Sequence, residues 1–449
     1  MSLPTRFPDR DEVAAVRAEA DLLEAGAESS ERRRLAGRVL GRRGHGKLVF
    51  LDLVDRSGRI QLLCAADRSG PVDVDLGDIV GVVGLPAKTK RGEPSLVVEE
   101  LELLAKIKRP LPDTFHGLVD TETRYRRRYL DLLVNEESRR DFVLRSRMVS
   151  AIRRYLDERG FVEVETPILQ PRYGGALAEP FVTHHNELDA DFYLRIADEL
   201  YLKRLIVGGL EKVYEIGKDF RNEGVSFKHQ PEFTMLEWYE AYADYEDTMA
   251  RVEDLVATVA RETVGTTEVT FRGHELDLAP PWRRLRLVEA LEAEGVWTCD
   301  ADDLRRRLTE RDIDTSRDDT WPQLVDHAVS QLVEPSLVEP SILYDYPVEL
   351  SPLARRKEGE EGIVERFEYF VGGVELGNAY TELNDPDEQA SRFAEGGGDD
   401  PDYVEALSYG MPPTGGLGLG IDRLAMVLTG RETIRDVILF PTLREQPRS

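Results

Sequence analysis

The chain has 449 residues, 41% of them hydrophobic, and a formal net charge of −27. This length allows two or three domains with a large core, and the sequence contains no apolar run of about 18 residues that could span a membrane. Cys64 and Cys299 are isolated, which argues against a disulfide framework or a zinc site. The first residues lack the apolar core of a signal peptide, so we expect a cytoplasmic protein.

The N-terminal part of the chain predicts a small β-barrel. Residues 1–30 predict a short helix or tail, and residues 31–108 contain about five short strands separated by Gly-containing and charged turns. That density of strands is typical of the oligonucleotide-binding (OB) fold. Seven basic residues and no acid lie between Arg32 and Lys47. Because the rest of the chain is acidic, this run favours RNA binding over a merely solvated surface.

A stiff linker and a second, larger domain are expected next. Residues 109–118 include Pro110 and Pro112 and predict the linker. From residue 119 to 449, strand and helix patterns alternate. The segment near 254–340 is more helical and charge-rich, and we expect it to be an insertion.

The segment "FRNEGVSFKHQPEFTMLEWY", residues 220–239, predicts one side of a hairpin that faces a ligand. Side chains alternate across a strand, so Phe233, Glu237 and Tyr239 share one face. Upstream, Glu215 and Arg221 lie opposite the core-facing side chains. An antiparallel sheet can bury one face and leave the other for a ligand. A surface ion-pair ladder is the alternative, but it would expose both aromatic rings to water.

The segment "FEYFVGGVELGNAYTELND" predicts a second hairpin, in which Asn378, Tyr380 and Glu382 share one face. Glu368 and Glu375 form a carboxylate pair suited to magnesium (Mg2+), a hard cation that prefers oxygen ligands. Glu375 is out of phase with Asn378. We therefore expect a β-bulge near Gly377 to turn both side chains inward.

The segment "GLGLGIDR" predicts a glycine-rich strand that runs into a helix. Gly416, Gly418 and Gly420 alternate, which leaves one strand face bare so that a flat ligand could lie on it. Arg423 falls in the first helical turn. Together with Arg221 it could neutralise a triphosphate from two sides.

These segments resemble the three signature motifs of class II aminoacyl-tRNA synthetases: "GFVEVETPIL" around Pro167, "FRNE" at 220–223, and "GLGLGIDR" at 416–423. "HQPEFTMLEWYEAYADY" and "TIRDVILFP" are most similar to the lysyl-specific members of class IIb. The resemblance covers roughly residues 35–445. It implies an α+β fold, with an OB-fold β-barrel followed by a catalytic domain built on a mostly antiparallel sheet flanked by helices.

The resemblance also implies an activity. L-lysine would be activated with ATP to lysyl-adenylate, with release of pyrophosphate, and then transferred to the 3′ end of tRNA(Lys). Up to three Mg2+ ions would assist in each active site. A homodimer would form through the motif around Pro167.

Roles carry over to this chain by position. The ATP-binding residues so implied are Arg221, Glu223, His229, Phe233, Glu375 and Arg423, of which Arg221 and Arg423 are catalytic. The lysine-binding residues are Gly175, Glu199, Arg221, Tyr239, Asn378, Tyr380 and Glu382. Metal ligands are Glu368 and Glu375, and the anticodon readers are Phe50, Gln61 and Glu100. Tyr380 departs from the phenylalanine common in the family.

Three alternatives remain open. An aspartyl- or asparaginyl-type class IIb synthetase would share the fold. An aspartate site, however, needs a cation at its base, and Asn378, Tyr380 and Glu382 offer none. A ligase that lysylates a non-tRNA acceptor would tend to lack the barrel. A non-catalytic regulator would be expected to have lost a motif residue such as Arg221 or Arg423.

Overall fold

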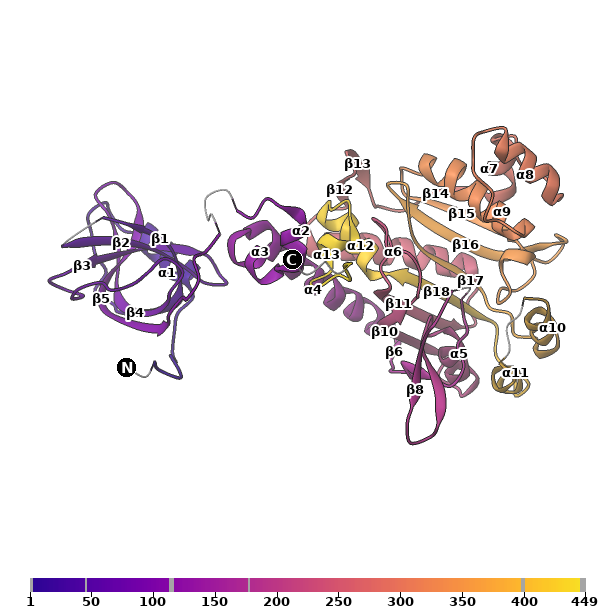
Figure 1. Ribbon diagram of the computed structural model, residues 1–449, viewed down its shortest axis with the longest axis horizontal. Coiled ribbons are helices and arrows are strands. Elements are labelled where there is room, and N and C mark those ends of the chain that lie inside the picture. Colours follow the sequence, from indigo (N-terminus) through magenta and orange to yellow (C-terminus); the bar gives the residue numbers. More distant parts are fainter. Residues whose placement is uncertain (1–2, 45–46, 113–116, 177, 397–399, 445–449) are drawn as a thin grey trace. The chain divides into compact units, whose positions relative to one another are not determined.

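The computed structural model describes residues 3–44, 47–112, 117–176, 178–396 and 400–444. By its contacts the chain divides into two compact units, Met1–Asn135 and Glu136–Ser449 (Figure 1). Each unit is described by itself.

The first unit is built around a closed five-stranded barrel. Its strands are β1 (Arg33–Arg43), β2 (Leu48–Val54), β3 (Arg59–Ala65), β4 (Ile79–Lys88) and β5 (Pro94–Ala105), in the order β1-β2-β3-β5-β4. Helix α1 (Val13–Asp21) inserts Val13 and Val16 into the barrel core. Of the two options expected for residues 1–30, a short helix or a tail, the structure therefore contains the helix, and it is docked on the barrel. Two short helices, α2 (Thr121–Arg126) and α3 (Arg128–Val134), complete the unit.

The basic run at the start of the barrel is largely paired. Arg32 lies 2.9 Å from Glu99, Arg33 lies 2.7 Å from Glu19, and Arg43 lies 3.1 Å from Asp52. Residues 45 and 46 of the run are outside the described residues. The expected free basic patch is thus weaker than the sequence indicates, because neighbouring carboxylates neutralise much of its charge.

The second unit is centred on an eight-stranded sheet in the order β14-β15-β16-β17-β18-β11-β10-β6. Among the described strands of this sheet, only the pairs β14–β15 and β10–β6 are parallel. The strands are β6 (Val162–Glu163), β10 (Lys212–Phe220), β11 (Glu232–Ala241), β14 (Arg283–Arg286), β15 (Ser341–Pro347), β16 (Ile363–Val371), β17 (Val374–Thr381) and β18 (Thr414–Gly420). Smaller sheets comprise β12 (Glu268–Phe271) with β13 (His274–Asp277), and β7 (Leu169–Gln170), β9 (Ala190–Leu194) and β8 (Phe181–His185).

Helices bury one face of this sheet. They are α4 (Glu136–Asp157), α6 (Tyr245–Thr263), α12 (Ile421–Thr429) and the short α13 (Ile434–Val437) (Figure 1). Met148 from α4, Val252 from α6 and Leu424 from α12 pack into one core with Trp238 and Leu417 of the sheet. Because the apolar side chains of alternate strand positions are used here, the opposite face is left for polar groups.

A second core holds the more helical segment. It joins α7 (Leu287–Ala293), α8 (Ala301–Thr309), α9 (Trp321–Ala328) and the turns η1 (Val329–Val333), η2 (Glu334–Ser336) and η3 (Val348–Leu350) to strands β14–β16. Residues 254–263 instead belong to α6 and to the main core. The predicted start of the insertion, near residue 254, is therefore too early, because a helical pattern alone does not reveal which core a helix joins.

The remaining helices, α5 (Glu199–Val207), α10 (Pro386–Gly396) and α11 (Pro401–Leu407), border the open face of the sheet. Leu202, Tyr239 and Tyr403 belong to one small cluster there. No helix in the described part of the chain combines the length and apolar composition needed to cross a bilayer.

Candidate active site

The central strands align the predicted polar face. Glu215 of β10 pairs with Glu237 of β11, and Tyr239 of β11 pairs with Gly416 of β18. On the other side of β18, Tyr380 of β17 also pairs with Gly416. The alternation predicted from the sequence thus gathers side chains from four strands on the face that the helices leave open.

Gly416 is required by the pocket itself. A Cβ atom at this position would overlap Oε1 of Glu382 and the ring of Tyr239. At Gly418 the nearest atom to a built Cβ is the flexible Met235 Cε, at 3.1 Å. The bare face expected for a flat ligand is therefore already filled at Gly416, and the glycine makes room for pocket side chains.

Three buried carboxylates, Glu199, Glu237 and Glu382, form the core of the site. The Tyr239 hydroxyl donates to Oε2 of Glu237 at 2.9 Å, and the Tyr380 hydroxyl donates to Oε1 of Glu199 at 2.5 Å. We call this group the carboxylate pocket. Buried carboxylates that are only partly satisfied are suited to bind cationic groups.

Gly175 lies at the edge of the carboxylate pocket. Its φ of +87° favours glycine, and a Cβ there would lie 3.3 Å from the Cβ of Glu199. Asn378 pairs with Gly418 and Glu368 in neighbouring strands, and so lies on the same face as Tyr380.

Glu237 lies in the carboxylate pocket, although the family resemblance did not imply a role for it. Burial, together with the nearby carboxylates of Asp219 and Glu199, raises its pKa to about 8. A signal was present, because Glu237 shares a strand face with Phe233 and Tyr239. A carboxylate on an otherwise aromatic strand face is itself a binding-site indication.

Nothing in the sequence indicated that Lys203 of α5 also belongs to this pocket. Its Nζ donates to Oε1 of Glu199 at 2.5 Å and forms an ion pair with Glu382. Its side chain is fully buried. A cation therefore does lie at the base of the pocket, contrary to the reasoning that excluded aspartate, although two carboxylates neutralise it.

Behind the pocket lies a second acidic group. One carboxylate oxygen from each of Asp198, Asp219 and Glu237 lies within 4.8 Å of the others, and all three residues are buried. The Nε of Arg195 lies 3.4 Å from Asp198 and 3.2 Å from Asp219. Burial and mutual repulsion raise the pKa of Asp198, and burial raises that of Asp219. Arg195 and a proton shared by Asp198 and Asp219 can offset part of the charge of this group.

At the other end of the face, Arg423 and His229 border the loop between β10 and β11. The Nη1 of Arg423 donates to the backbone oxygen of Glu375 at 2.8 Å, and its Nε donates to that of Lys228 at 3.3 Å. Partial desolvation, together with the cations Arg423 and Lys228, lowers the pKa of His229 to about 4. The imidazole is thus neutral at neutral pH, and Ser226 contacts its Nδ1 at 2.8 Å.

Arg221 and Phe233 lie together at the open end of the hairpin. The guanidinium carbon of Arg221 is 5.3 Å from the centroid of the Phe233 ring, within cation–π range. The backbone N–H of Arg221 donates to the carbonyl of Pro231 at 2.9 Å and so closes the loop. Glu223 is exposed on that loop.

Glu368 and Glu375 lie on adjacent antiparallel strands. The register shifts between the pairs Tyr369–Gly377 and Phe370–Glu375, which leaves one extra residue in β17 next to Gly377. The predicted bulge is confirmed. Burial, together with the neighbouring carboxylate of Glu375, raises the pKa of Glu368 to about 7, although Arg366, 2.6 Å away, opposes the rise. Two close carboxylates that repel each other fit a divalent cation.

The three barrel positions are spread over three strands. Phe50 is half-buried on β2, Gln61 on β3 is buried, and Glu100 is exposed on β5. Gln61 donates to Oγ of Ser95 at 2.9 Å and accepts from Arg43 at 3.1 Å. The side-chain amide of Gln61 is therefore already hydrogen-bonded to neighbours within the barrel.

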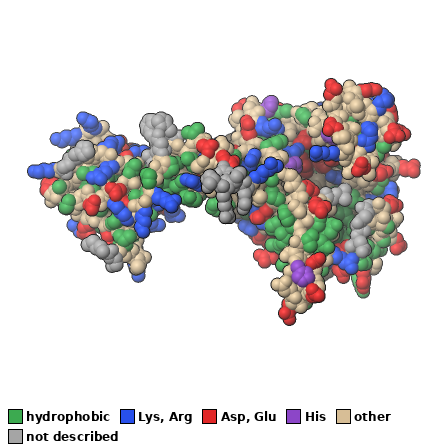
Figure 2. All heavy atoms as spheres, in the orientation of Figure 1, with side chains coloured by type: hydrophobic (Ala, Val, Ile, Leu, Met, Phe, Trp, Pro, Cys, Tyr) green, Lys and Arg blue, Asp and Glu red, His purple; other side chains and the backbone are tan. Residues whose placement is uncertain are grey.

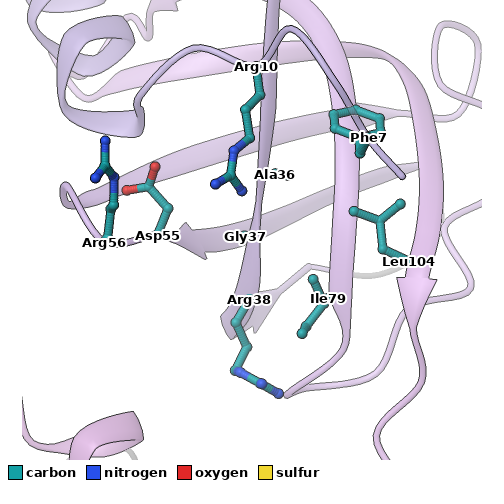
Figure 3. Close-up of a pocket in the computed structure, with 9 residues that line it drawn as sticks. All are labelled: Phe7, Arg10, Ala36, Gly37, Arg38, Asp55, Arg56, Ile79 and Leu104. Atoms are coloured by element: carbon teal, nitrogen blue, oxygen red, sulfur yellow. The ribbon is translucent and has the colours of Figure 1, made fainter. Parts of the chain in front are cut away.

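The barrel unit also has a shallow pocket of about 340 Å³, lined by Phe7, Arg10, Ala36, Gly37, Arg38, Asp55, Arg56, Ile79 and Leu104 (Figure 3). None of the three residues that we expect to read the anticodon, Phe50, Gln61 and Glu100, lines it. Figure 2 shows Lys and Arg side chains scattered over the barrel unit and many Asp and Glu side chains at the rim of the second unit.

Comparison with known families agrees with this geometry. The family described as "tRNA synthetases class II (D, K and N)" matches residues 120–444, and the "OB-fold nucleic acid binding domain" matches residues 34–104. The chain belongs to the class II tRNA synthetases of the D, K and N type. Its barrel and its helix-flanked sheet confirm the fold class predicted from the sequence.

Within this family, similar curated proteins are named lysine–tRNA ligase. The protein from Moorella thermoacetica is 52% identical over 431 residues, covering 91% of this chain and 88% of its own length. The one from Bacillus subtilis is 49% identical, covering 92% and 87%. That from Dehalococcoides mccartyi is 46% identical over 469 residues, covering 98% and 93%.

Proposed function

We propose that this protein is a lysine–tRNA ligase, which activates L-lysine with ATP and transfers it to the 3′ end of tRNA(Lys). The observation that carries the proposal is the carboxylate pocket of Glu199, Glu237 and Glu382. The similarity to proteins named lysine–tRNA ligase over more than nine-tenths of the chain supports the same substrate.

The carboxylate pocket accommodates both ammonium groups of lysine. Glu237 and Glu382, with the Tyr239 hydroxyl, bind the ε-ammonium, which needs three acceptors. Glu199, beside Gly175 and Tyr380, binds the α-ammonium. Asn378 and Arg221 hold the lysine carboxylate.

ATP binds toward the other end of the face. Phe233 stacks on the adenine, with Glu223 at its edge, and Arg221, His229 and Arg423 contact the phosphates. Glu368 and Glu375 would hold Mg2+, up to three ions being the number that the family resemblance implies. When bound, the metal neutralises phosphate charge.

The chemistry needs no general base in its first step. The lysine carboxylate is already ionised, attacks the α-phosphorus in line and displaces pyrophosphate. The guanidinium groups of Arg221 and Arg423 stabilise the negative charge that develops on the phosphate oxygens. The terminal ribose hydroxyl of tRNA then attacks the lysyl carbonyl, and AMP leaves.

The wider assembly follows the same reasoning. We retain the division into 31–108, 109–118 and 119–449, which the family matches at 34–104 and 120–444 support; contacts group the residues up to Asn135 with the barrel. Phe50, Gln61 and Glu100 read the anticodon.

Around Pro167, the large apolar side chains Val162, Ile168, Leu169 and Tyr173 are exposed, which supports a homodimer formed there. The reaction takes place in the cytoplasm.

An aspartyl- or asparaginyl-type specificity is the closest rival. The buried cation Lys203 would be its strongest support, but two carboxylates already pair with it. Lysine-dependent ATP–pyrophosphate exchange, followed by charging of purified tRNA, separates the candidates. We expect exchange with lysine alone and transfer to tRNA(Lys). Exchange with aspartate or asparagine, or lysine exchange without transfer to tRNA, would overturn the assignment.

A further inference from the structure

Lys203 is a buried cation inside the pocket that we assign to a cationic substrate. Its side chain has no exposed surface, and its Nζ contacts two carboxylates that are far apart in the sequence, Glu199 and Glu382. Glu199 begins α5, whereas Glu382 follows β17. The ring centroids of Tyr380 and Tyr239 lie 5.3 Å and 6.0 Å from the same ammonium, so aromatic faces shield it from water.

The contacts make Lys203 charged despite its burial. Desolvation lowers the pKa of a buried amine, but here Glu199 and Glu382 more than reverse that effect and raise the pKa of Lys203 above its usual value. Tyr403 of α11 also faces it. Removing one partner of such an ion pair leaves the other charge buried and unpaired, which is costly. Lys203, Glu199 and Glu382 therefore act as a unit.

The charge of the pocket then matches one kind of ligand. Glu199, Glu237 and Glu382 set three carboxyl groups against the single ammonium of Lys203, so two negative charges remain unmatched once a bound cation has ionised all three. Free lysine supplies two ammonium groups, and its carboxylate is matched by Arg221. An amino acid with a neutral side chain would leave one buried carboxylate unpaired, which is costly in a low-dielectric site.

We propose that Lys203 is a specificity-determining residue of the lysine pocket, a fixed internal cation that ties Glu199 to Glu382 and sets both the charge and the spacing that the two ammonium groups of the substrate must match. The inference rests on the proposed function. Lys203 contacts no reacting atom; it acts through the two carboxylates that it holds.

The test begins with Lys203→Met, which keeps an unbranched side chain one atom shorter and removes its charge. We expect the KM for lysine in pyrophosphate exchange to rise at least about tenfold, while the KM for ATP changes less than about twofold, because only the lysine-binding carboxylates lose their partner. Discrimination of lysine from ornithine, one methylene shorter, should also fall. Arg204→Met is the matched control: Arg204 is the next residue of α5, but pairs with Asp400 and Asp402 outside the pocket.

Charge and packing are separated by chemical rescue. In Lys203→Ala, added n-propylammonium should lower the raised KM for lysine, whereas n-propanol of similar size should not. Equal rescue by the alcohol would reduce Lys203 to a packing residue. A lysine KM that is unchanged in Lys203→Met would overturn the proposal, and a lowered one would show that Lys203 competes with the substrate.

A measurement on the wild-type chain covers the case in which neither variant folds. The protein has ten lysines, and ¹⁵N-detected NMR of their Nζ groups should show one slowly exchanging ammonium that stays charged at pH 10 with and without bound lysine. Loss of that signal would overturn the proposal. If the wild-type chain supports no lysine-dependent exchange at all, the proposed function fails instead.

Discussion

Arg423 donates from a single nitrogen, Nη1, to both the backbone oxygen and the carboxylate of Glu375, at 2.8 and 3.1 Å. The helix that follows the glycine-rich strand is thereby fastened to the bulged strand that carries a proposed metal ligand. Arg423 lowers the pKa of Glu375, although burial alone would raise it. The guanidinium thus helps keep Glu375 ionised for a cation, while its third nitrogen, Nη2, can face phosphate oxygens.

Replacing Arg423 tests the placement of the triphosphate. We expect Arg423→Ala to lower the rate of lysine-dependent pyrophosphate exchange by about 10²-fold or more, the scale of losing one donor to a developing oxyanion. The circular dichroism spectrum should be retained. Arg306→Ala is the control, because Arg306 lies on the surface of α8 and, within the described part of the chain, forms ion pairs with Asp303 and Glu310 alone. Exchange within a few-fold of wild type would mean that the phosphates lie elsewhere.

The raised pKa of Glu237 predicts a pH-dependent affinity for lysine. In the free protein this carboxyl is protonated below about pH 8, because burial and the carboxylates of Asp219 and Glu199 oppose its ionisation. The ε-ammonium favours the ionised form, so the bound state holds fewer protons. Affinity should therefore rise with pH, by about tenfold per unit at most, up to about pH 8, and then level off.

Calorimetric titration of lysine between pH 6 and 9 measures this profile. Glu237→Gln should weaken binding and flatten the profile, since the titrating group is removed. A wild-type affinity that does not change between pH 6 and 8 would show that Glu237 is ionised before lysine arrives.

Gly416 and Gly418 offer a matched pair of substitutions on one strand. An added Cβ at Gly416 would overlap Glu382 and Tyr239, whereas at Gly418 its neighbours would be the end of Met235 at 3.1 Å and the backbone oxygen of Asn378 at 3.9 Å. Gly416→Ala should raise the KM for lysine by about five- to 150-fold, since an overpacked site costs about 1–3 kcal/mol, while Gly418→Ala should change it less than about threefold. Equal effects would indicate that the strand as a whole, and not the carboxylate pocket, is sensitive.

Much of the candidate site could be predicted from strand alternation. The pattern of β10 and β11 assigned Glu215, Phe233 and Tyr239 to one face, and their cross-strand pairing bears this out. The phase mismatch between Glu375 and Asn378 required a bulge, and the register of β17 contains it. These relations are local, since each depends on residues within one hairpin.

Lys203 could not be predicted in the same way. A lysine within an amphipathic helix such as α5 is usually solvated, and nothing local indicates otherwise. Its burial depends on Glu382, on a different strand far along the chain. Likewise, Tyr380 and Glu199 are hydrogen-bonded although they are 181 residues apart. The need for glycine at position 217 also depends on a distant residue, because a Cβ there would overlap the guanidinium of Arg195.

Glu382 provides the last prediction. It is almost fully buried and, with Glu237, it is the carboxylate assigned to the ε-ammonium. Glu382→Gln leaves a cationic substrate and Lys203 to share the remaining acids, and breaking a buried charge pair costs about 3–5 kcal/mol. We therefore expect the KM for lysine in pyrophosphate exchange to rise by about 10²- to 10³-fold, with the KM for ATP nearly unchanged. Glu240→Gln is the control, because Glu240 is also a buried, ion-paired glutamate of this sheet but contacts Lys212 and Arg251. If both variants bind lysine equally well, the ε-ammonium does not bind at Glu382.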